Sequence, residues 1–516
     1  MLNLDGQQLS IQDIVKVSQN SIEVSLTPDA QTRIAESQKW VQNIAAGDKP
    51  VYGINTGFGI FANKFISPQD TIKLNRNLIL SHAVGTGPDL PDEVVRAAMV
   101  IRANTLASGN SGIRLETVNT LLEMLNRGVI PIIPSQGSLG SSGDLAPLSH
   151  LALVMTTDEK DLEAESGWAK IGGNKLSGKS AMSKARINRV ILGPKEGLAL
   201  TNGATFSAAL AALVIHQAQI LVDTADIALA MSLEALLGAS AAFDNRLHQA
   251  RRQNGQITVA NRIRELTSGS TLLDAAGRVQ DAYSLRCGPQ VQGPVRDTLT
   301  FAQGIIENEI NAVTDNPLLF GPDEAISGGN FHGQPIGMVM DYLKIALAEL
   351  GAISERRTYH LTDEKINAGL PPMLVSNVEA AGLNSGMMMP QYTAASLVLE
   401  NQNLASPDSV HSLPTSGGKE DHNANAMTAA RHAWQAAQNT AHILAIEIYC
   451  AARALDLRMK SIPDAKFGNG VGSAQHAFRQ VVAYQQGDAW WGPEIERTRQ
   501  WIMDGHLNKA VEANQH

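Results

Sequence analysis

The chain of 516 residues contains only two cysteines, Cys287 and Cys450, which lie far apart in the sequence and in dissimilar surroundings. Such a pair excludes a disulfide framework and offers no cysteine cluster for a metal. The first residues also lack the positive and apolar segments of a secretory signal peptide. We therefore expect reduced thiols and a protein that stays in the cytoplasm.

Clusters of basic residues are missing as well. The 41 Lys and Arg are scattered along the chain, and the formal net charge is -9 at pH 7, so no basic stripe is available for nucleic acid. The glycine-rich segments 53–59 and 137–143 lack the Lys-Ser/Thr of a phosphate loop, and they do not match a dinucleotide fingerprint. These absences argue against nucleic-acid and nucleotide binding.

No long apolar run continues without interruption. In the most apolar segment, 208–243, polar residues recur every few positions, namely His216, Gln217, Gln219, Asp223, Asp226 and Glu234. A membrane-spanning helix needs about 20 nearly uninterrupted apolar residues, so we expect no membrane span. An Ala- and Leu-rich helix of this kind is typical of the centre of a large bundle or of a subunit interface. We expect the interface.

Helix-forming patterns fill most of the chain. Residues 22–26 have β-strand character, and Thr27-Pro28-Asp29 then supplies an N-cap, a first-turn proline and an early acid for a helix that runs to Ala46. The run from Tyr52 to Asn63 is too rich in glycine for a regular element, which indicates a loop. Loops of this kind often carry function.

Three later segments, 295–312, 335–361 and 427–457, repeat Ala, Leu, Glu and Gln at helical spacing. We therefore predict a mainly α fold, with a mixed α/β region over residues 1–200 and an α-helical bundle with C-terminal helices over residues 201–516. No composition shift marks a linker, so we expect one cooperative unit.

The tripeptide Ser141-Ser142-Gly143 can condense on itself into an electrophile. If the Gly143 nitrogen attacks the Ser141 carbonyl and two waters leave, the product is 4-methylideneimidazol-5-one (MIO), which has an electron-poor alkene. The ring needs a residue without Cβ at its third position, a hydroxyl at its second and a small side chain at its first. The tripeptide satisfies all three requirements, but serine and glycine also cluster in ordinary loops.

The surrounding segment 134–150 resembles the signature of the histidine and aromatic amino acid ammonia-lyases, Gly-Ser-x-Gly-Ala-Ser-Gly-Asp-Leu-Ala-Pro-Leu. Only Ser141 departs from it, where alanine is usual. At least six separated segments are similar to the family, including 314–317 and 354–357. The resemblance implies a fumarase/aspartase-like long-helix bundle, MIO as the only cofactor, and a homotetramer with active sites shared between subunits.

Elimination of ammonia requires a better leaving group, a grip on the carboxylate and a base over the β-carbon. MIO would assist the departure of the amine. Tyr52 is the candidate base, since the loop Tyr52–Gly59 matches the family segment with the catalytic tyrosine. A free tyrosine has a pKa of about 10, so roughly one in a thousand is ionised at pH 7. We therefore expect an electropositive site that lowers the pKa of Tyr52.

The segment 278–290 is the second long match, with Ala282 where the family commonly has proline. By resemblance, Arg286 binds the substrate carboxylate, a task that suits a planar guanidinium fork. Tyr283, as a catalytic residue, and Gln280, as a binding residue, would line the same cavity. The alternative for Arg286 is a surface ion pair.

Two further matches contribute one residue each. Asn202 is expected to orient the substrate carboxylate or the MIO oxygen, and Phe331 to pack against the substrate or MIO. For Phe331, a place in the core is nearly as reasonable. The four histidines His82, His150, His332 and His422 fit no helical His pair or Cys/His module, so we expect no metal site.

His82 and Glu420 bear on which amino acid is bound. Histidine and tyrosine lyases have histidine at the position of His82, and Glu420-Asp-His422 resembles histidine ammonia-lyases. A carboxylate can accept from an imidazole N–H, whereas beside a phenyl ring it would be buried with little compensation. L-Histidine, converted to urocanate, is therefore the expected substrate. Lys419 and the run 423–426 depart from the family pattern at this point.

The sequence leaves other functions open. A broader tyrosine or phenylalanine ammonia-lyase, or a 2,3-aminomutase that adds the ammonia back, would use the same electrophile. A binding homologue without catalysis would carry a tripeptide that never cyclises.

Overall fold

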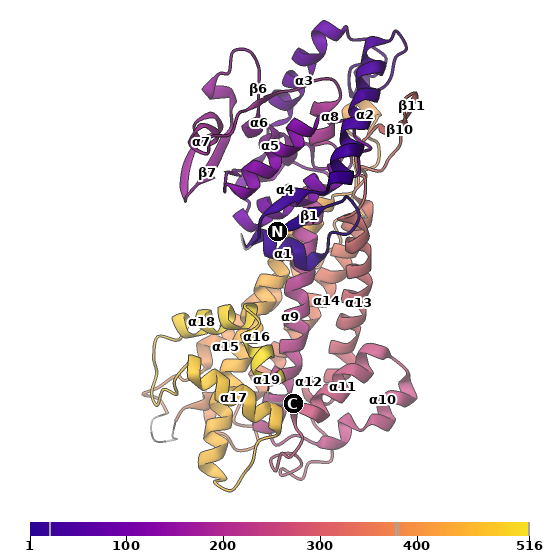
Figure 1. The fold of residues 1–516 in the computed structure, drawn as a ribbon. Helices are drawn as coiled ribbons and strands as arrows, with labels where there is room; N and C mark the ends of the chain where they lie inside the picture. Colours follow the sequence, from indigo (N-terminus) through magenta and orange to yellow (C-terminus); the bar gives the residue numbers. More distant parts are fainter. Residues whose placement is uncertain (20–21, 377–378, 380, 514–516) are drawn as a thin grey trace. The chain divides into compact units, whose positions relative to one another are not determined.

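The computed structural model describes residues 1–19, 22–376, 379 and 381–513, and helices dominate it (Figure 1). The chain forms two compact units. Unit 1 contains residues 1–216, 303–341 and 407–431, and unit 2 contains residues 217–302, 342–406 and 432–516.

This division differs from the expected boundary at residue 200, because two late segments of the chain pack with the N-terminal region. In the segment 303–341, the Leu319 N–H donates to the Asn110 carbonyl over 2.9 Å, and in the segment 407–431, the Asn425 N–H donates to the Leu139 carbonyl over 2.7 Å. Unit 1 is therefore assembled from three stretches of sequence, which a single boundary cannot represent.

All the strands of the described chain belong to unit 1, where they form small separate sheets. Two pairs are parallel and the other pairings are antiparallel. The sheets are β1 (Leu2–Leu4) with β2 (Val24–Leu26), β3 (Thr86–Asp89) with β5 (Pro134–Gln136), β4 (Ile130–Pro131) with β7 (Trp168–Ile171) and β8 (Asn174–Ser177), β6 (Thr156–Thr157) with β9 (Val190–Ile191), and β10 (Leu318–Gly321) with β11 (Glu324–Ile326).

Helices α1 (Ile11–Ser18), α2 (Pro28–Ala46) and α5 (Leu115–Asn126) pack against α4 (Asp92–Ala107), in which every residue from Val94 to Ala107 is buried. Thr27 caps α2, with a proline at the first position, as the sequence predicts. The remaining helices of this unit are η1 (Gly59–Phe61), α3 (Pro68–His82), α6 (Leu145–Met155), η2 (Glu163–Glu165), α7 (Gly178–Lys184), α8 (Glu196–Thr201) and η6 (Ser416–Gly418).

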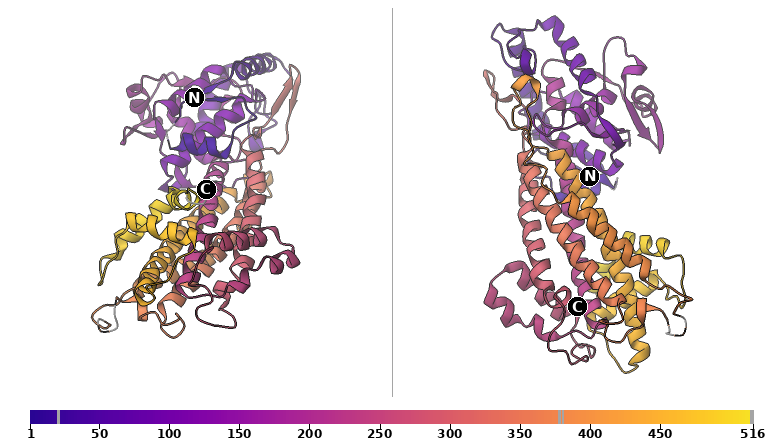
Figure 2. Two further views of the ribbon diagram at one scale, coloured as in Figure 1. Left: turned by 60° about the horizontal axis from the view of Figure 1, so that its bottom comes forward. Right: turned by 180° about the vertical axis from the view of Figure 1, so that it is seen from behind.

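Four long helices have residues in both units: α9 (Thr205–Ala235), α13 (Gly288–Glu309), α14 (Gln334–Thr362) and α16 (Ala426–Ser461). The three predicted late helices correspond to α13, α14 and α16. The parts of the four helices in unit 2 run side by side (Figure 2). The shorter helices of unit 2 are η3 (Ser240–Phe243), α10 (Asn245–Arg251), α11 (Asn254–Leu266), α12 (Tyr283–Arg286), η4 (Pro372–Leu374), α15 (Met388–Leu404), α17 (Asn469–Val481), α18 (Trp491–Met503) and α19 (His506–Glu512).

Helix α9 corrects one expectation. It is long and apolar enough to cross a membrane by length and composition alone, but 78% of its most apolar window is buried within the chain. The predicted subunit interface is therefore wrong for most of this helix, which is a core helix of its own chain. Its apolar side chains are needed to fill that core.

A network of buried charges lies inside unit 2. Arg357 and Glu447 are both fully buried and form an ion pair, and Ser232 and Ser354 donate to the two oxygens of the same carboxylate over 2.8 and 2.6 Å. Buried charges are tolerated when they are paired and fully hydrogen-bonded.

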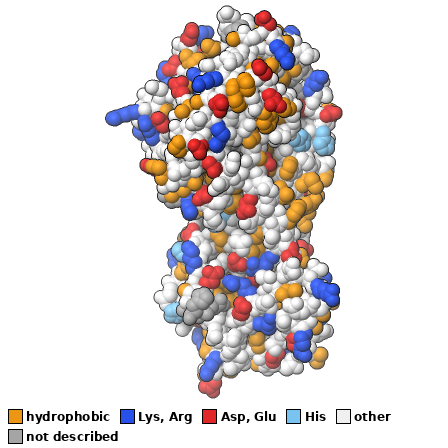
Figure 3. Space-filling view, turned by 45° about the vertical axis from the view of Figure 1, so that its right-hand side comes forward, with side chains coloured by type: hydrophobic (Ala, Val, Ile, Leu, Met, Phe, Trp, Pro, Cys, Tyr) orange, Lys and Arg blue, Asp and Glu red, His pale blue; other side chains and the backbone are white. Residues whose placement is uncertain are grey.

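On the surface, acidic and basic side chains are interspersed over the face in Figure 3.

Candidate active site

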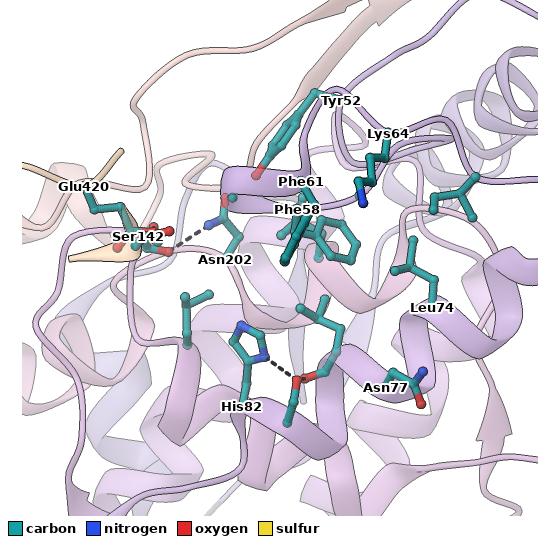
Figure 4. Close-up of a pocket in the computed structure, with 18 residues that line it drawn as sticks. Tyr52, Phe58, Phe61, Lys64, Leu74, Asn77, His82, Ser142, Asn202 and Glu420 are labelled. Atoms are coloured by element: carbon teal, nitrogen blue, oxygen red, sulfur yellow. Dashed lines mark hydrogen bonds between the residues drawn. The ribbon is translucent and has the colours of Figure 1, made fainter. Parts of the chain in front are cut away.

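A cavity of about 580 Å³ in unit 1 brings five of the predicted site residues together (Figure 4). They are Tyr52, His82, Ser142, Asn202 and Glu420. An adjoining cavity of about 530 Å³ shares Tyr52, Ser142, Asn202 and Glu420 with the first. Ser141 and Phe331 line this second cavity, so Phe331 is not confined to the core.

The close approach of two glycines shapes the loop that carries the tripeptide. Gly143 has a φ of +83°, and a Cβ atom there would lie 2.2 Å from the backbone of Gly203. Only glycine fits such an approach in this conformation. The Asp144 N–H donates to the Gly203 carbonyl over 2.9 Å, which holds the two segments together.

Ser142 is held by both its carbonyl and its hydroxyl. The carbonyl accepts from Asn202 Nδ2 over 2.7 Å and from the Gly203 N–H over 3.3 Å. The hydroxyl donates to Glu420 Oε1 over 2.8 Å. Two donors on one carbonyl polarise it and stabilise negative charge on its oxygen. Figure 4 shows the bond between Asn202 and Ser142.

Ser141 faces away from solvent. Its side chain is buried, and its hydroxyl donates to Asn423 Oδ1. The sequence suggests only that a small side chain is needed here, and the contact with Asn423 was not foreseen. Both residues depart from the family pattern, and that shared departure is the signal that could have linked them.

Asp144 is a buried residue that the sequence analysis did not single out. Its carboxylate accepts from the Ser138 hydroxyl over 2.7 Å, the Ser207 N–H over 2.7 Å and the Ser207 hydroxyl over 3.0 Å. Burial raises the pKa of Asp144, and these donors oppose that rise. Its position directly after the tripeptide, at the start of α6, was the available signal. The carboxylate ties the loop to the beginning of α9.

The surroundings of Tyr52 do not lower the pKa of its phenol. Its pKa is raised above 10.0, first because the phenol is buried and then because the Glu420 carboxylate is near, although a hydrogen bond with the Gly59 backbone opposes the rise. The prediction that the site lowers the pKa of Tyr52 is therefore wrong for the residues that this chain places around the phenol. Both burial and a nearby negative charge disfavour the phenolate.

His82 is the last residue of α3 and lies across the cavity from Tyr52 (Figure 4). Its Nδ1 is paired with the Ser81 hydroxyl over 3.0 Å. Burial lowers the pKa of His82, although the Leu78 carbonyl and Glu420 oppose the change. The ring is therefore neutral at neutral pH. The wall of this cavity is mostly apolar and is formed in part by Phe58, Phe61, Leu74 and Leu78.

Gln280, Tyr283 and Arg286 belong to unit 2, and none of them lines either cavity. Tyr283 is 71% exposed, and the Arg286 guanidinium lies 4.6 Å from the centre of the Tyr283 ring. Among the described residues, Arg286 Nε has no hydrogen-bond partner. Arg357 of the buried network donates to the Ser284 carbonyl over 3.4 Å and so supports α12.

Lys419 and two histidines complete the wall of the adjoining cavity. The rings of His332 and His422 are stacked with their centres 6.1 Å apart, and His332 Nε2 lies 3.1 Å from the His422 carbonyl. No group of three or more His, Cys, Asp or Glu in the described chain is arranged to hold a metal ion.

Comparison with known proteins places this chain among enzymes. The aromatic amino acid lyase family model matches residues 9–482. The chain is 47% identical to the histidine ammonia-lyase of Gloeobacter violaceus over 516 residues, which cover 99% of this chain and 98% of that protein.

Solved structures show the same fold. The histidine ammonia-lyase from Trypanosoma cruzi has a TM-score of 0.90 and 35% identity, covering 99% of this chain and 95% of that chain. The tyrosine aminomutase from Streptomyces globisporus has a TM-score of 0.91 and 32% identity, covering 99% and 98%. The fold alone therefore does not separate lyases from aminomutases.

Proposed function

Because the chain belongs to the aromatic amino acid lyase family, we propose that it converts L-histidine to urocanate and ammonia. The chain is a carbon–nitrogen lyase. One observation carries the choice of substrate: the cavity of the tripeptide is lined by both His82 and Glu420. A neutral imidazole and a carboxylate can together bind the two ring nitrogens of a histidine side chain.

We further propose that Ser141-Ser142-Gly143 forms MIO. The Gly143 nitrogen bonds to the Ser141 carbonyl carbon, and the carbonyl oxygen leaves as water with the amide hydrogens of Gly143 and Ser142. A second water takes the Ser142 hydroxyl and its Cα hydrogen, which leaves the exocyclic alkene. The residues present fit this ring, since the loop already requires glycine at Gly143 and the Ser142 carbonyl already accepts from two donors.

The formed ring would supply an electrophile for the substrate amine. Asn202 and the Gly203 N–H would hold and polarise the oxygen of Ser142, because they already donate to it. Tyr52 would take the β-proton of the substrate, and the electron pair of the broken C–H bond would form the double bond as ammonia leaves. Glu420 and His82 would orient the substrate ring.

If Tyr52 is to act as a base, a positive group must offset the rise of its pKa, and Lys64 and Lys419 at the cavity walls are not among the groups that shift this pKa. We propose that another copy of the chain supplies Arg286, together with Gln280 and Tyr283, within a homotetramer. The exposure of Tyr283 and the unpartnered Arg286 Nε support this role. A guanidinium near the phenol would favour the phenolate and could also bind the substrate carboxylate bidentately. The cytoplasm remains the proposed location.

Incubation of the purified protein with histidine, tyrosine and phenylalanine, separately and without added cofactor, tests the proposal. We expect urocanate and ammonia from histidine, and loss of two waters from the 141–143 peptide by mass spectrometry. Preferential coumarate or cinnamate would contradict the roles of His82 and Glu420. A β-amino acid product would identify an aminomutase, and an unreacted peptide of full mass without turnover would identify a binding homologue.

A further inference from the structure

Two neighbouring serines of the tripeptide carry chemically identical hydroxyls that must meet different fates. Ring formation requires that the Ser142 hydroxyl leaves, whereas Ser141 only contributes its carbonyl to the ring. The segment 412–426 contacts both hydroxyls through different groups: Glu420 accepts from Ser142, and Asn423 accepts from Ser141. A carboxyl group can carry a proton to a departing hydroxyl, but a carboxamide oxygen only accepts.

The orientation of the Asn423 carboxamide is fixed by its second partner. Asn423 Nδ2 donates to the Leu413 carbonyl, which can only accept. The oxygen therefore faces Ser141, and the Ser141 hydroxyl has to donate. No N–H of this carboxamide is directed at the Ser141 oxygen, so nothing from Asn423 assists the departure of that hydroxyl.

Asn423 is itself held firmly. Its backbone N–H donates to the Ser412 hydroxyl over 2.8 Å, and its side chain is only 1% exposed. The alternative acceptor for Ser141 is the Leu139 carbonyl, 3.5 Å away, which already accepts from the Asn425 N–H over 2.7 Å. Asn423 is therefore the principal partner of the Ser141 hydroxyl.

We propose that Asn423 is a positioning residue for ring formation: it holds the Ser141 hydroxyl as a donor, which fixes the first residue of the ring and leaves Ser142 as the serine that is dehydrated. This inference rests on the proposed formation of MIO. Ser141 and Asn423 are then a matched pair: the Ser141 hydroxyl and Asn423 Oδ1 are both buried, and each is the hydrogen-bond partner of the other.

The test is a double-mutant cycle with Asn423→Val, Ser141→Ala and the double variant, read as the rate at which the 141–143 peptide loses two waters. Asn423→Val alone buries an unsatisfied hydroxyl and frees the first ring residue, so we expect water loss on the order of tenfold slower. The double variant removes both polar groups and should recover the wild-type rate. Asn401→Val, at a buried asparagine of unit 2 that donates to Thr440 over 3.1 Å, controls for general destabilisation and should leave the rate unchanged.

A second measurement needs no variant. Fragmentation of the wild-type peptide should locate the dehydration at Ser142 and retain the Ser141 hydroxyl, and loss of a third water would overturn the proposal. An unchanged rate in Asn423→Val would also overturn it, as would equal slowing by this substitution in the wild-type chain and in the Ser141→Ala variant. If the wild-type peptide retains its full mass, both this inference and MIO formation fail, whereas the other outcomes reject the role of Asn423 alone.

Discussion

In unit 2 the buried charges of Arg357 and Glu447 neutralise each other, whereas in unit 1 the polar groups of Ser142, Asn202 and Glu420 gather at the wall of a cavity. The first arrangement is closed, because two serines also donate to the Glu447 carboxylate. The second is open, because Asn202 Oδ1 is buried without a hydrogen-bond partner among the described residues.

This difference shows what a site requires beyond a stable core. A closed network contributes rigidity and leaves no group available for a ligand. An open one keeps donors and acceptors oriented but unsaturated, which is the condition for binding a reacting molecule. The Tyr283 and Arg286 pair on α12 is an open feature of unit 2, since Arg286 Nε has no hydrogen-bond partner among the described residues. The proposed shared site connects this pair with the cavity of a second copy.

The largest expected effect comes from the close contact inside unit 1. In Gly143→Ala the new Cβ would lie 2.2 Å from the Gly203 backbone, so we expect no water loss from the 141–143 peptide and no detectable elimination. Gly304→Ala is the control, because a Cβ there meets nothing within 4 Å. Normal dehydration in Gly143→Ala would show that the close approach is not required.

Removal of the proposed base should have the next largest effect. Tyr52→Phe should lower kcat by about 10²- to 10⁴-fold, the usual contribution of general base catalysis, while the tripeptide still loses two waters. Tyr392→Phe, at an exposed tyrosine of unit 2, should leave kcat unchanged. Equal loss of dehydration and turnover in Tyr52→Phe would assign Tyr52 to ring formation instead.

Mixing variants of the two units tests the shared site directly. Tyr52→Phe and Arg286→Gln should each be nearly inactive, but the two co-expressed should recover about a quarter of wild-type activity, since each half of a site is then intact in about half of the positions. The measurement is urocanate formation by the mixed protein against each variant alone. Without recovery, each chain would build its site from its own residues.

Specificity should respond to a smaller change in the cavity wall. His82→Leu should lower kcat/KM for histidine relative to phenylalanine by about 10- to 100-fold, because an apolar wall no longer complements a polar ring. Dehydration of the tripeptide serves as the control and should be unaffected. An unchanged ratio would exclude His82 from substrate selection.

The smallest effect concerns the stability of unit 2. Burial raises the pKa of the fully buried Glu234 to about 8, whereas the unfolded chain releases this proton near pH 4.3. The folded protein therefore binds more protons between these values, and its stability falls as pH rises through this window. Glu234→Gln should remove about 2 kcal/mol of the loss between about pH 6 and 8, measured by denaturant unfolding. Glu265→Gln, at an exposed glutamate of the same unit, should retain the wild-type slope.

The sequence predicts the structural features that depend on residues close together along the chain. The Thr27 cap and the helices α13, α14 and α16 follow from residues that are neighbours along the chain. The tripeptide and the loop from Tyr52 were found in the same way. The carboxylate of Asp144 and the contact between Ser141 and Asn423 were missed, because their partners are distant in sequence and no periodicity connects them.

By itself the sequence determined the helical character, the family and the chemistry that Ser141-Ser142-Gly143 can perform, since these depend on residue types and short spacings. Only the tertiary structure decided that α9 is buried within its own chain, that two late segments return to unit 1, and that the pKa of Tyr52 is raised rather than lowered. Burial and charge proximity depend on groups that folding brings together. For that reason the residues could be named from the sequence, whereas their electrostatic state required the three-dimensional arrangement.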